Sequence, residues 1–155
     1  MSHEIERKFL VTGDSWRDAV AESQSIRQGY LSVDAERVVR IRLVDEQHGF
    51  VTIKSKRVGY TRSEFEYAIP ADDAKFLLDE MCLRPLLEKR RHLLSTPPGS
   101  WIVDEFEGAH AGLVVAEVEL PSEDTAIDIP GWVSREVTHD DSYANSALVA
   151  SAADR

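Results

Sequence analysis

Charged side chains recur along this chain as pairs of like sign that lie two positions apart. The pairs are Glu4 and Glu6 (followed by Lys8), Arg40 and Arg42, Lys54 and Lys56, Glu64 and Glu66, Lys89 and Arg91, and Glu117 and Glu119. In a β-strand, residues two positions apart point to the same face of the sheet. Each pair therefore predicts a strand that carries two like charges on one face.

Bases on some strands and acids on others form a set of groups suited to phosphate chemistry. Lysine and arginine bind phosphate oxygens, and one guanidinium can bind two of them at once. Carboxylates bind hard divalent cations such as Mg²⁺ or Mn²⁺, which neutralise and polarise phosphate groups. Without such ligands, like charges crowded into a space of low dielectric constant would be unfavourable.

Alternation of polar and apolar residues predicts that the elements carrying these pairs are mostly strands. They are expected at 4–11, 26–33, 37–45, 50–57, 61–69, 86–95, 101–107 and 113–120. Helical spacing predicts a helix from Pro70 to about residue 83, a short helix after Asp14 or Ser15, and a helix over 144–154. No break in composition divides the chain, so we expect one domain over residues 1–155.

Two arrangements would satisfy this pattern, because the faces opposite the charges are largely apolar. In the first, a barrel or sandwich has an apolar interior and its charges point to water. In the second, a wide barrel holds the charges inside, and helices and loops cover part of its apolar outer face. Periodicity alone does not choose between the two arrangements. The phosphate chemistry favours the second.

The motifs also follow one another in the order typical of a known family. They are Glu4-Ile5-Glu6-Arg7-Lys8, Gln28-Gly29-Tyr30-Leu31, Arg40-x-Arg42, Thr52-Ile53-Lys54, Arg62-x-Glu64-x-Glu66, Glu88-Lys89-x-Arg91, Trp101-x-x-Asp104-x-Phe106, Leu113-x-x-Ala116-Glu117-x-Glu119-Leu120, and Val137-Thr138 with Tyr143 and Asn145-Ser146. This set resembles the CYTH domain, the triphosphate tunnel metalloenzymes, over residues 3 to about 149. The resemblance implies an α+β, mainly β fold: an eight-stranded antiparallel closed barrel that forms a tunnel, with a few covering helices.

The resemblance also implies roles for individual residues. The carboxylates expected to bind one or two Mg²⁺ or Mn²⁺ ions are Glu4, Glu6, Asp104, Glu117 and Glu119. The bases expected to bind phosphate are Lys8, Arg40, Arg42, Lys54, Lys56, Arg62, Lys89 and Arg91, of which Lys56 and Arg62 share the parity of the site but match the family less closely. Glu64 and Glu66 are expected to orient a water, to take its proton or to hold the bases in place. Lys8 and Tyr30 are further candidates for the catalytic set, and the alternative for Tyr30 is a wall residue.

The expected activity is hydrolysis of a triphosphate, first of all inorganic triphosphate, to pyrophosphate and phosphate. The alternatives are a thiamine or nucleoside triphosphatase, an adenylate cyclase of the class IV type, and a non-catalytic module that binds polyphosphate or nucleotide. One position departs from the resemblance, because Ser142 stands where short bacterial members tend to carry an arginine. The missing arginine could change which triphosphate the protein prefers, and it does not alter the charged pairs expected to bind metal and phosphate.

The overall charge describes the outer surface more than the site. The chain has 28 acids and 18 bases and a net charge of −10, which disfavours long nucleic acids and anionic membranes as partners. The predicted site holds seven of the acids and eight of the bases, so the remaining residues carry a charge of −11. A single cysteine, Cys82, and an N-terminus without an apolar stretch predict a cytoplasmic protein. A small-molecule triphosphate is the expected partner, and a homodimer is also considered.

Overall fold

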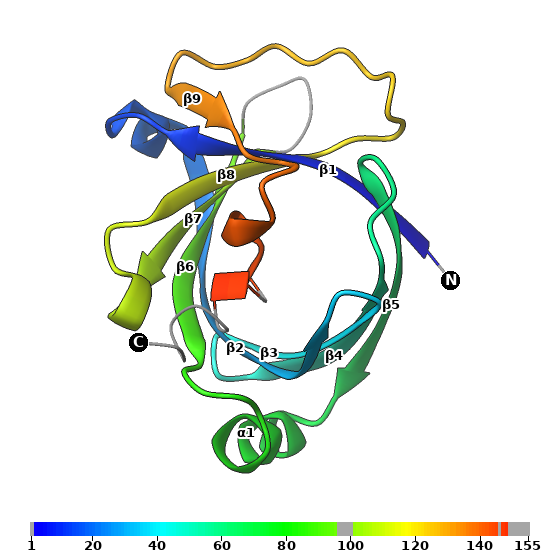
Figure 1. The fold of residues 1–155 in the computed structure, drawn as a ribbon. Coiled ribbons are helices and arrows are strands. Elements are labelled where there is room, and N and C mark those ends of the chain that lie inside the picture. The colour runs from blue at the N-terminus through cyan, green and yellow to red at the C-terminus, as the bar shows by residue number, and fades with distance from the viewer. Residues whose placement is uncertain (1, 96–100, 146, 149–155) are drawn as a thin grey trace.

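The computed structural model describes residues 2–95, 101–145 and 147–148, and its strands form a closed antiparallel barrel (Figure 1). The barrel strands are β1 (Ser2–Val11), β2 (Val20–Asp34), β3 (Arg37–Val44), β4 (His48–Ser55), β5 (Thr61–Ile69), β6 (Leu87–Leu94), β7 (Trp101–Glu107) and β8 (Val114–Glu119). Their order is β5-β4-β3-β2-β6-β7-β8-β1, and pairing of β1 with β5 closes the ring. The predicted eight-stranded closed barrel is therefore confirmed.

Strand β1 closes the barrel because it changes partner along its length. Its first residues pair with β5, where Glu4 lies opposite Arg62. Its next residues pair with β8, where Glu6 lies opposite Glu119 and Lys8 lies opposite Glu117. The acids of β1 and β8 are thus neighbours in the wall, and the bases of the β4–β5 region lie on the other side of the closing seam.

A ninth strand, β9 (Val133–Glu136), pairs with the end of β1 outside the ring and was not among the strands predicted. After β9 the chain turns into one end of the barrel, where the short helix η3 (Asp141–Tyr143) lies within the ring in Figure 1. Leu148 is buried there with Tyr30, Val38 and Leu87. Most of the helix predicted over 144–154 lies outside the described residues.

Helices and loops cover part of the outer wall. Helix α1 (Ala71–Glu80) follows Pro70 and buries Ala74 and Leu78 against apolar residues of β3, as the spacing predicted, although it ends three residues earlier. The expected short helix is the 3₁₀ helix η1 (Ser15–Ala19). A second 3₁₀ helix, η2 (Gly108–His110), joins β7 to β8.

The main apolar cluster lies on the outside of the ring, between the wall and its cover. Trp16 of η1 and Trp132 of the 120–132 connection pack there with Trp101 and Phe9 of the wall. The alternate residues of the same strands point inward and include the charged pairs. The structure therefore has the second of the two arrangements, with charges inside and an apolar outer face partly covered. Within the described ranges, no helix is long and apolar enough to cross a membrane.

Candidate functional site

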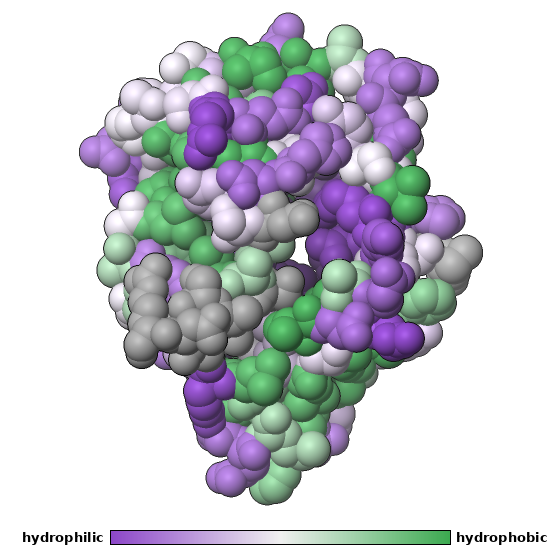
Figure 2. All heavy atoms as spheres, in the orientation of Figure 1, coloured by the Kyte–Doolittle hydropathy of each residue, from purple (hydrophilic) through white to green (hydrophobic). Residues whose placement is uncertain are grey.

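The lumen of the barrel is a cavity of about 640 Å³ lined by charged side chains. Figure 2 shows it opening on one face, bordered on one side by hydrophilic residues. Fourteen of the predicted site residues line it: Glu4, Glu6, Lys8, Tyr30, Arg40, Arg42, Lys54, Lys56, Arg62, Glu64, Glu66, Arg91, Glu117 and Glu119. Lys89 and Asp104 complete the predicted set and lie buried beside the lumen.

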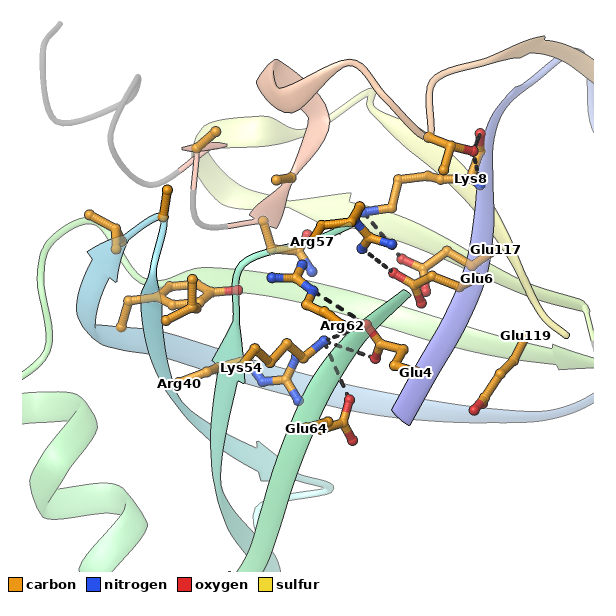
Figure 3. A pocket seen from close by; sticks show the side chains of 18 of the residues that line it. Glu4, Glu6, Lys8, Arg40, Lys54, Arg57, Arg62, Glu64, Glu117 and Glu119 are labelled. Carbon is orange, nitrogen blue, oxygen red and sulfur yellow. Dashed lines mark hydrogen bonds and ion pairs between the residues drawn. The ribbon is translucent and has the colours of Figure 1, made fainter. Parts of the chain in front are cut away.

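Glu4 is held by bases from the opposite side of the seam (Figure 3). Lys54 Nζ donates to its two carboxylate oxygens at 3.1 and 2.9 Å, and Arg62 Nε lies 3.6 Å away. Glu64 lies 3.6 Å from the same Lys54 nitrogen. Burial alone would raise the pKa of Glu4, but the charge of Lys54, the hydrogen bonds with Glu64 and Lys54 and the charge of Arg62 together hold that pKa well below its usual range.

Glu6 lies in a crowded group of carboxylates on β1 and β8. Arg57 donates to it at 3.3 Å, from the segment that follows β4. Burial raises the pKa of Glu6 to about 7, and the negative charges of Glu117 and Glu4 act in the same direction. Glu117 lies 3.6 Å from Lys8, and the charges of Lys8 and Arg91 lower its pKa in spite of its burial. The local excess of negative charge at Glu6 is what a divalent cation would relieve.

The chemistry of these donors fits a hard cation, because Glu4, Glu6 and Glu117 supply oxygen ligands from neighbouring strands. Among the described residues, no three His, Cys, Asp or Glu side chains are already grouped as a metal site. Each of the three carboxylates is instead held by a base. Glu119 is exposed, lies opposite Glu6 in register and has no ion pair with the described residues.

Strand β3 contributes two bases to the wall of the cavity, Arg40 and Arg42. Arg40 lies 3.5 Å from Glu66, and Thr52 links the two by accepting from Arg40 at 3.1 Å and donating to Glu66 at 2.9 Å. Two buried guanidinium nitrogens, Arg40 Nε and Arg62 Nε, have no hydrogen-bond acceptor among the described residues. Arg42 is held by the amide of Gln28. The wall thus presents donors that an added anion would satisfy.

Asp104 is enclosed by two of the predicted phosphate ligands. Lys89 donates to it at 2.7 Å, and Arg91 donates to both its oxygens at 2.8 and 2.9 Å. The side chains of Lys89 and Asp104 are 0% and 2% exposed, so this pair does not face the cavity directly. The charges of Arg91 and Lys89 overcome the effect of burial and hold the pKa of Asp104 far below its usual range. Burial lowers the pKa of Lys89 to about 7.

The remaining predicted residues lie at the edges of the site. Lys56 is at the mouth, where its side chain is 65% exposed and lies 3.6 Å from Glu36. Tyr30 is buried in the wall and is among the residues that line the cavity. Burial raises the pKa of Glu64 to about 7, and a hydrogen bond with Glu4 acts in the same direction.

Three residues of the site were missed by sequence reasoning: Arg57, Thr52 and Gln28. Arg57 has the opposite parity to Lys54 and Lys56, and it reaches the lumen because β4 ends at Ser55. Thr52 has the parity of Lys54 on β4, and Gln28 has the parity of Tyr30 on β2, which is the signal that could have found them. Ser142 stands where short members of the family tend to carry an arginine, and it closes a turn by donating from its backbone N–H and its hydroxyl to Asp140. The base that contacts the neighbouring Tyr143 is Arg135, at 3.3 Å.

A closed antiparallel barrel whose lumen carries opposed bases and carboxylates defines a tunnel protein for a small polyanion. The CYTH domain model matches residues 2–146, and the chain belongs to this family. It is 42% identical to an inorganic triphosphatase from Acetivibrio thermocellus over 96% of this chain and 94% of that protein. It is 36% identical to an inorganic triphosphatase from Nitrosomonas europaea, over 96% of this chain and 97% of that protein.

Solved structures agree with this assignment. The inorganic triphosphatase NE1496 superposes with a TM-score of 0.69 and 34% identity, over 94% of this chain and 97% of that one. A putative adenylyl cyclase from Hippeastrum, described with a dominant triphosphatase activity, has a TM-score of 0.62 over 77% of this chain and 80% of that one. Its identity to this chain is 15%, so it shares the fold.

Proposed function

We propose that this chain hydrolyses inorganic triphosphate to pyrophosphate and phosphate, with Mg²⁺ or Mn²⁺ as cofactor. The observation that carries the proposal is the lumen itself: a cavity of about 640 Å³ in which bases and carboxylates from most of the barrel strands face one another. This volume is within the usual range for a small-molecule site. The names of the two curated relatives, both inorganic triphosphatases, support the choice of substrate.

Phosphate binding would follow from an exchange of partners. Lys54, Arg62 and Lys8 now pair with Glu4 and Glu117 of neighbouring parts of the wall. Phosphate oxygens would take over these bases and would also satisfy the two buried guanidinium nitrogens that lack an acceptor. The released carboxylates would then be free to bind a cation.

Glu4, Glu6, Glu117 and Glu119 are the residues that would hold the cation. A divalent cation there would neutralise phosphate oxygens and lower the pKa of a bound water. Asp104 was predicted to join these ligands, and its two basic partners support a different contribution, the positioning of Arg91 at the wall. Its role as a ligand stays a prediction.

The residues of the chain would then act on a linear triphosphate lying along the lumen. Lys8, Arg40, Arg42, Lys54, Arg62 and Arg91 would bind its oxygens, with Lys56 at the mouth and the buried Lys89 behind Arg91. A water attacks the terminal phosphorus, the bond to the bridging oxygen breaks, and pyrophosphate leaves with the bonding electrons. The bases stabilise the charge that develops on the leaving group.

The two glutamates of β5 differ in their contacts. Glu66 holds Arg40, directly and through Thr52, which supports a role in positioning that base. Glu64 lies beside Lys54 and Glu4 at the centre of the charged group, which supports a role in orienting the attacking water or accepting its proton. Tyr30 lines the cavity, and we infer that its hydroxyl would donate to a phosphate oxygen there.

A substrate panel tests the proposal. Tripolyphosphate, thiamine triphosphate and ATP are each incubated with the chain and Mg²⁺ or Mn²⁺, and phosphate, pyrophosphate and cyclic AMP are measured. The proposal predicts the highest kcat/KM for tripolyphosphate, with phosphate and pyrophosphate as products. Preference for thiamine triphosphate or ATP, formation of cyclic AMP, or binding without turnover would each replace it with one of the alternative activities.

The partners and location of the protein stay predictions. We propose one domain over residues 1–155, a cytoplasmic location, no long nucleic acid or membrane partner, and a homodimer as the alternative to a monomer. The net charge of −10 supports the exclusion of nucleic acid, because a long polyanion would be repelled by the outer surface.

A further inference from the structure

The charge of Arg42 is not compensated in the way that the charges of the other lumen bases are. Each of the other bases predicted to bind phosphate, and Arg57 with them, forms an ion pair with a carboxylate. Arg42 forms none with the residues that the structure describes, although it lines the same cavity. Its charge is therefore available to an incoming anion without the release of a carboxylate.

The side chain of Gln28 takes the place of that missing carboxylate. Its amide oxygen accepts two hydrogen bonds from Arg42, at 2.9 Å from Nε and 2.7 Å from Nη2. Gln28 is 0% exposed, and β2 places it directly opposite Arg42 of β3 in register. The neutral amide of Gln28 thus fixes the plane of the Arg42 guanidinium. Nη1 of Arg42 has no acceptor among the described residues.

The orientation of the amide follows from its two neighbours. A guanidinium only donates hydrogen bonds, so the amide oxygen must face Arg42. The amide nitrogen then faces the other way and donates to the Tyr30 hydroxyl oxygen at 3.3 Å. Because that oxygen accepts, the hydroxyl hydrogen of Tyr30 is left to donate to another group. The buried amide of Gln28 thereby orients two hydrogen-bond donors, the charged guanidinium of Arg42 and the neutral hydroxyl of Tyr30.

The surroundings of Arg42 disfavour its charged form. Burial lowers the pKa of Arg42 to about 9, and the positive charges of Arg40 and Arg91 act in the same direction. Tyr30 and Asp104 oppose this effect without overcoming it. An anion bound among Arg40, Arg42 and Arg91 would relieve the repulsion between these three bases.

We propose that Gln28 is a positioning residue that orients Arg42 without neutralising it, and that Arg42 and the Tyr30 hydroxyl form an anion subsite that needs no metal. The inference rests on the proposed function for the identity of the anion, which is taken to be triphosphate. A carboxylate at position 28 would keep both hydrogen bonds to Arg42 and remove the free charge. The subsite therefore depends on the neutrality of Gln28 as well as on its geometry.

The test compares Gln28→Glu with wild type and with Gln47→Glu, which makes the same chemical change in an exposed turn. Binding of tripolyphosphate is measured by calorimetry in EDTA, and thermal unfolding without ligand reports folding. We expect wild type and Gln47→Glu to bind in EDTA. We expect Gln28→Glu to bind at least about tenfold more weakly, which corresponds to about 1.4 kcal/mol, with an unfolding temperature no lower than that of wild type.

A merely structural role for Gln28 predicts the opposite, because glutamate preserves the hydrogen bonds that hold Arg42. Equal affinity of Gln28→Glu and wild type would overturn the inference, as would a wild-type chain that fails to bind tripolyphosphate in EDTA. If Gln28→Glu does not fold, Gln28→Met carries the test. This variant has no charge and no strong acceptor, and an unchanged affinity would again contradict the inference.

Failure of the proposed function would be visible separately. Hydrolysis is followed with Mg²⁺ or Mn²⁺, whereas the subsite is followed by binding in EDTA. A chain that binds tripolyphosphate through Arg42 and does not hydrolyse it would refute the triphosphatase proposal and leave the role of Gln28 supported.

Discussion

Lys54 on β4 donates to both carboxylate oxygens of Glu4 on β1, at 3.1 and 2.9 Å, and so joins a predicted phosphate ligand to a predicted metal ligand. The two residues are 50 positions apart in sequence and meet because β1 pairs with β5 at the closing seam. The same kind of pair recurs between Lys8 and Glu117. Several of the predicted phosphate ligands are thus paired with predicted metal ligands of the same lumen.

The carboxylates of these pairs should be required for turnover and not for folding. We expect Glu4→Gln and Glu117→Gln each to lower metal-dependent phosphate release at least about a hundredfold, in keeping with the large contribution of electrostatic groups at active sites. The amide still accepts a hydrogen bond from the neighbouring base, so both variants should fold, although the loss of the counter-charge of Lys54 or Lys8 should lower the thermal unfolding temperature. Glu22→Gln on the exposed part of β2 is the matched control and should retain activity. Wild-type turnover in either site variant would refute the metal assignment.

Asp104 should behave differently, because two bases depend on it. Asp104→Asn leaves Lys89 and Arg91 without their counter-charge in a buried position. We expect a loss of about 3–5 kcal/mol in the free energy of unfolding, measured by urea denaturation, in addition to any loss of activity. A variant with wild-type stability and an altered metal requirement would instead support the role of Asp104 as a ligand.

Acid should weaken the attachment of β9 to β1. Arg7 donates to both oxygens of Glu136, at 2.9 and 2.6 Å, and these hydrogen bonds hold the pKa of Glu136 below its ordinary value of 4.5. A carboxyl whose folded pKa is lowered stabilises the fold above its unfolded pKa, and this stabilisation is lost as the pH falls through the folded value. We expect the unfolding temperature of wild type to fall more steeply below about pH 4.5 than that of Glu136→Gln. Parallel curves for the two proteins would contradict this reading.

Glu123 should hold the turn that carries Arg57 toward the lumen. Its carboxylate accepts from the Tyr60 backbone N–H at 2.8 Å and from the Thr61 hydroxyl at 3.1 Å. Glu123→Ala should therefore speed hydrogen exchange of the Tyr60 amide and raise the KM for tripolyphosphate a few-fold. Glu123→Gln keeps an acceptor and should behave like wild type. Asp124→Ala, which changes the exposed neighbour, is the control. Unchanged exchange in Glu123→Ala would show that the turn is held by other contacts.

Much of the site could be predicted because strand parity is a local property. The spacing of two within each charged pair is enough to place both members on one face, and the apolar partners of Glu4 and Lys54 on the alternate face require a cover. The phosphate chemistry of these groups then favoured the inside of a barrel for the charges, and the family resemblance implied the same arrangement. The eight predicted strands were located to within a few residues, apart from the early start of β2 at Val20.

Contacts that depend on how the ring closes could not be predicted from the sequence. Arg57 meets Glu6 only because the chain leaves β4 at Ser55 and turns back over the seam. Asp104 is buried by Lys89 and Arg91 because β6 and β7 place all three side chains together, and the same spacing would fit an exposed ligand. The four residues of β9 are too few for a periodic signal.

Release of phosphate from tripolyphosphate is the decisive measurement for the proposed activity. The purified chain is incubated with tripolyphosphate and Mg²⁺ or Mn²⁺, and phosphate and pyrophosphate are quantified, with EDTA and Glu117→Gln as the two controls. We expect equal amounts of phosphate and pyrophosphate with metal, and neither product above background in the controls. No release with either metal, or release that persists undiminished in EDTA, would contradict it.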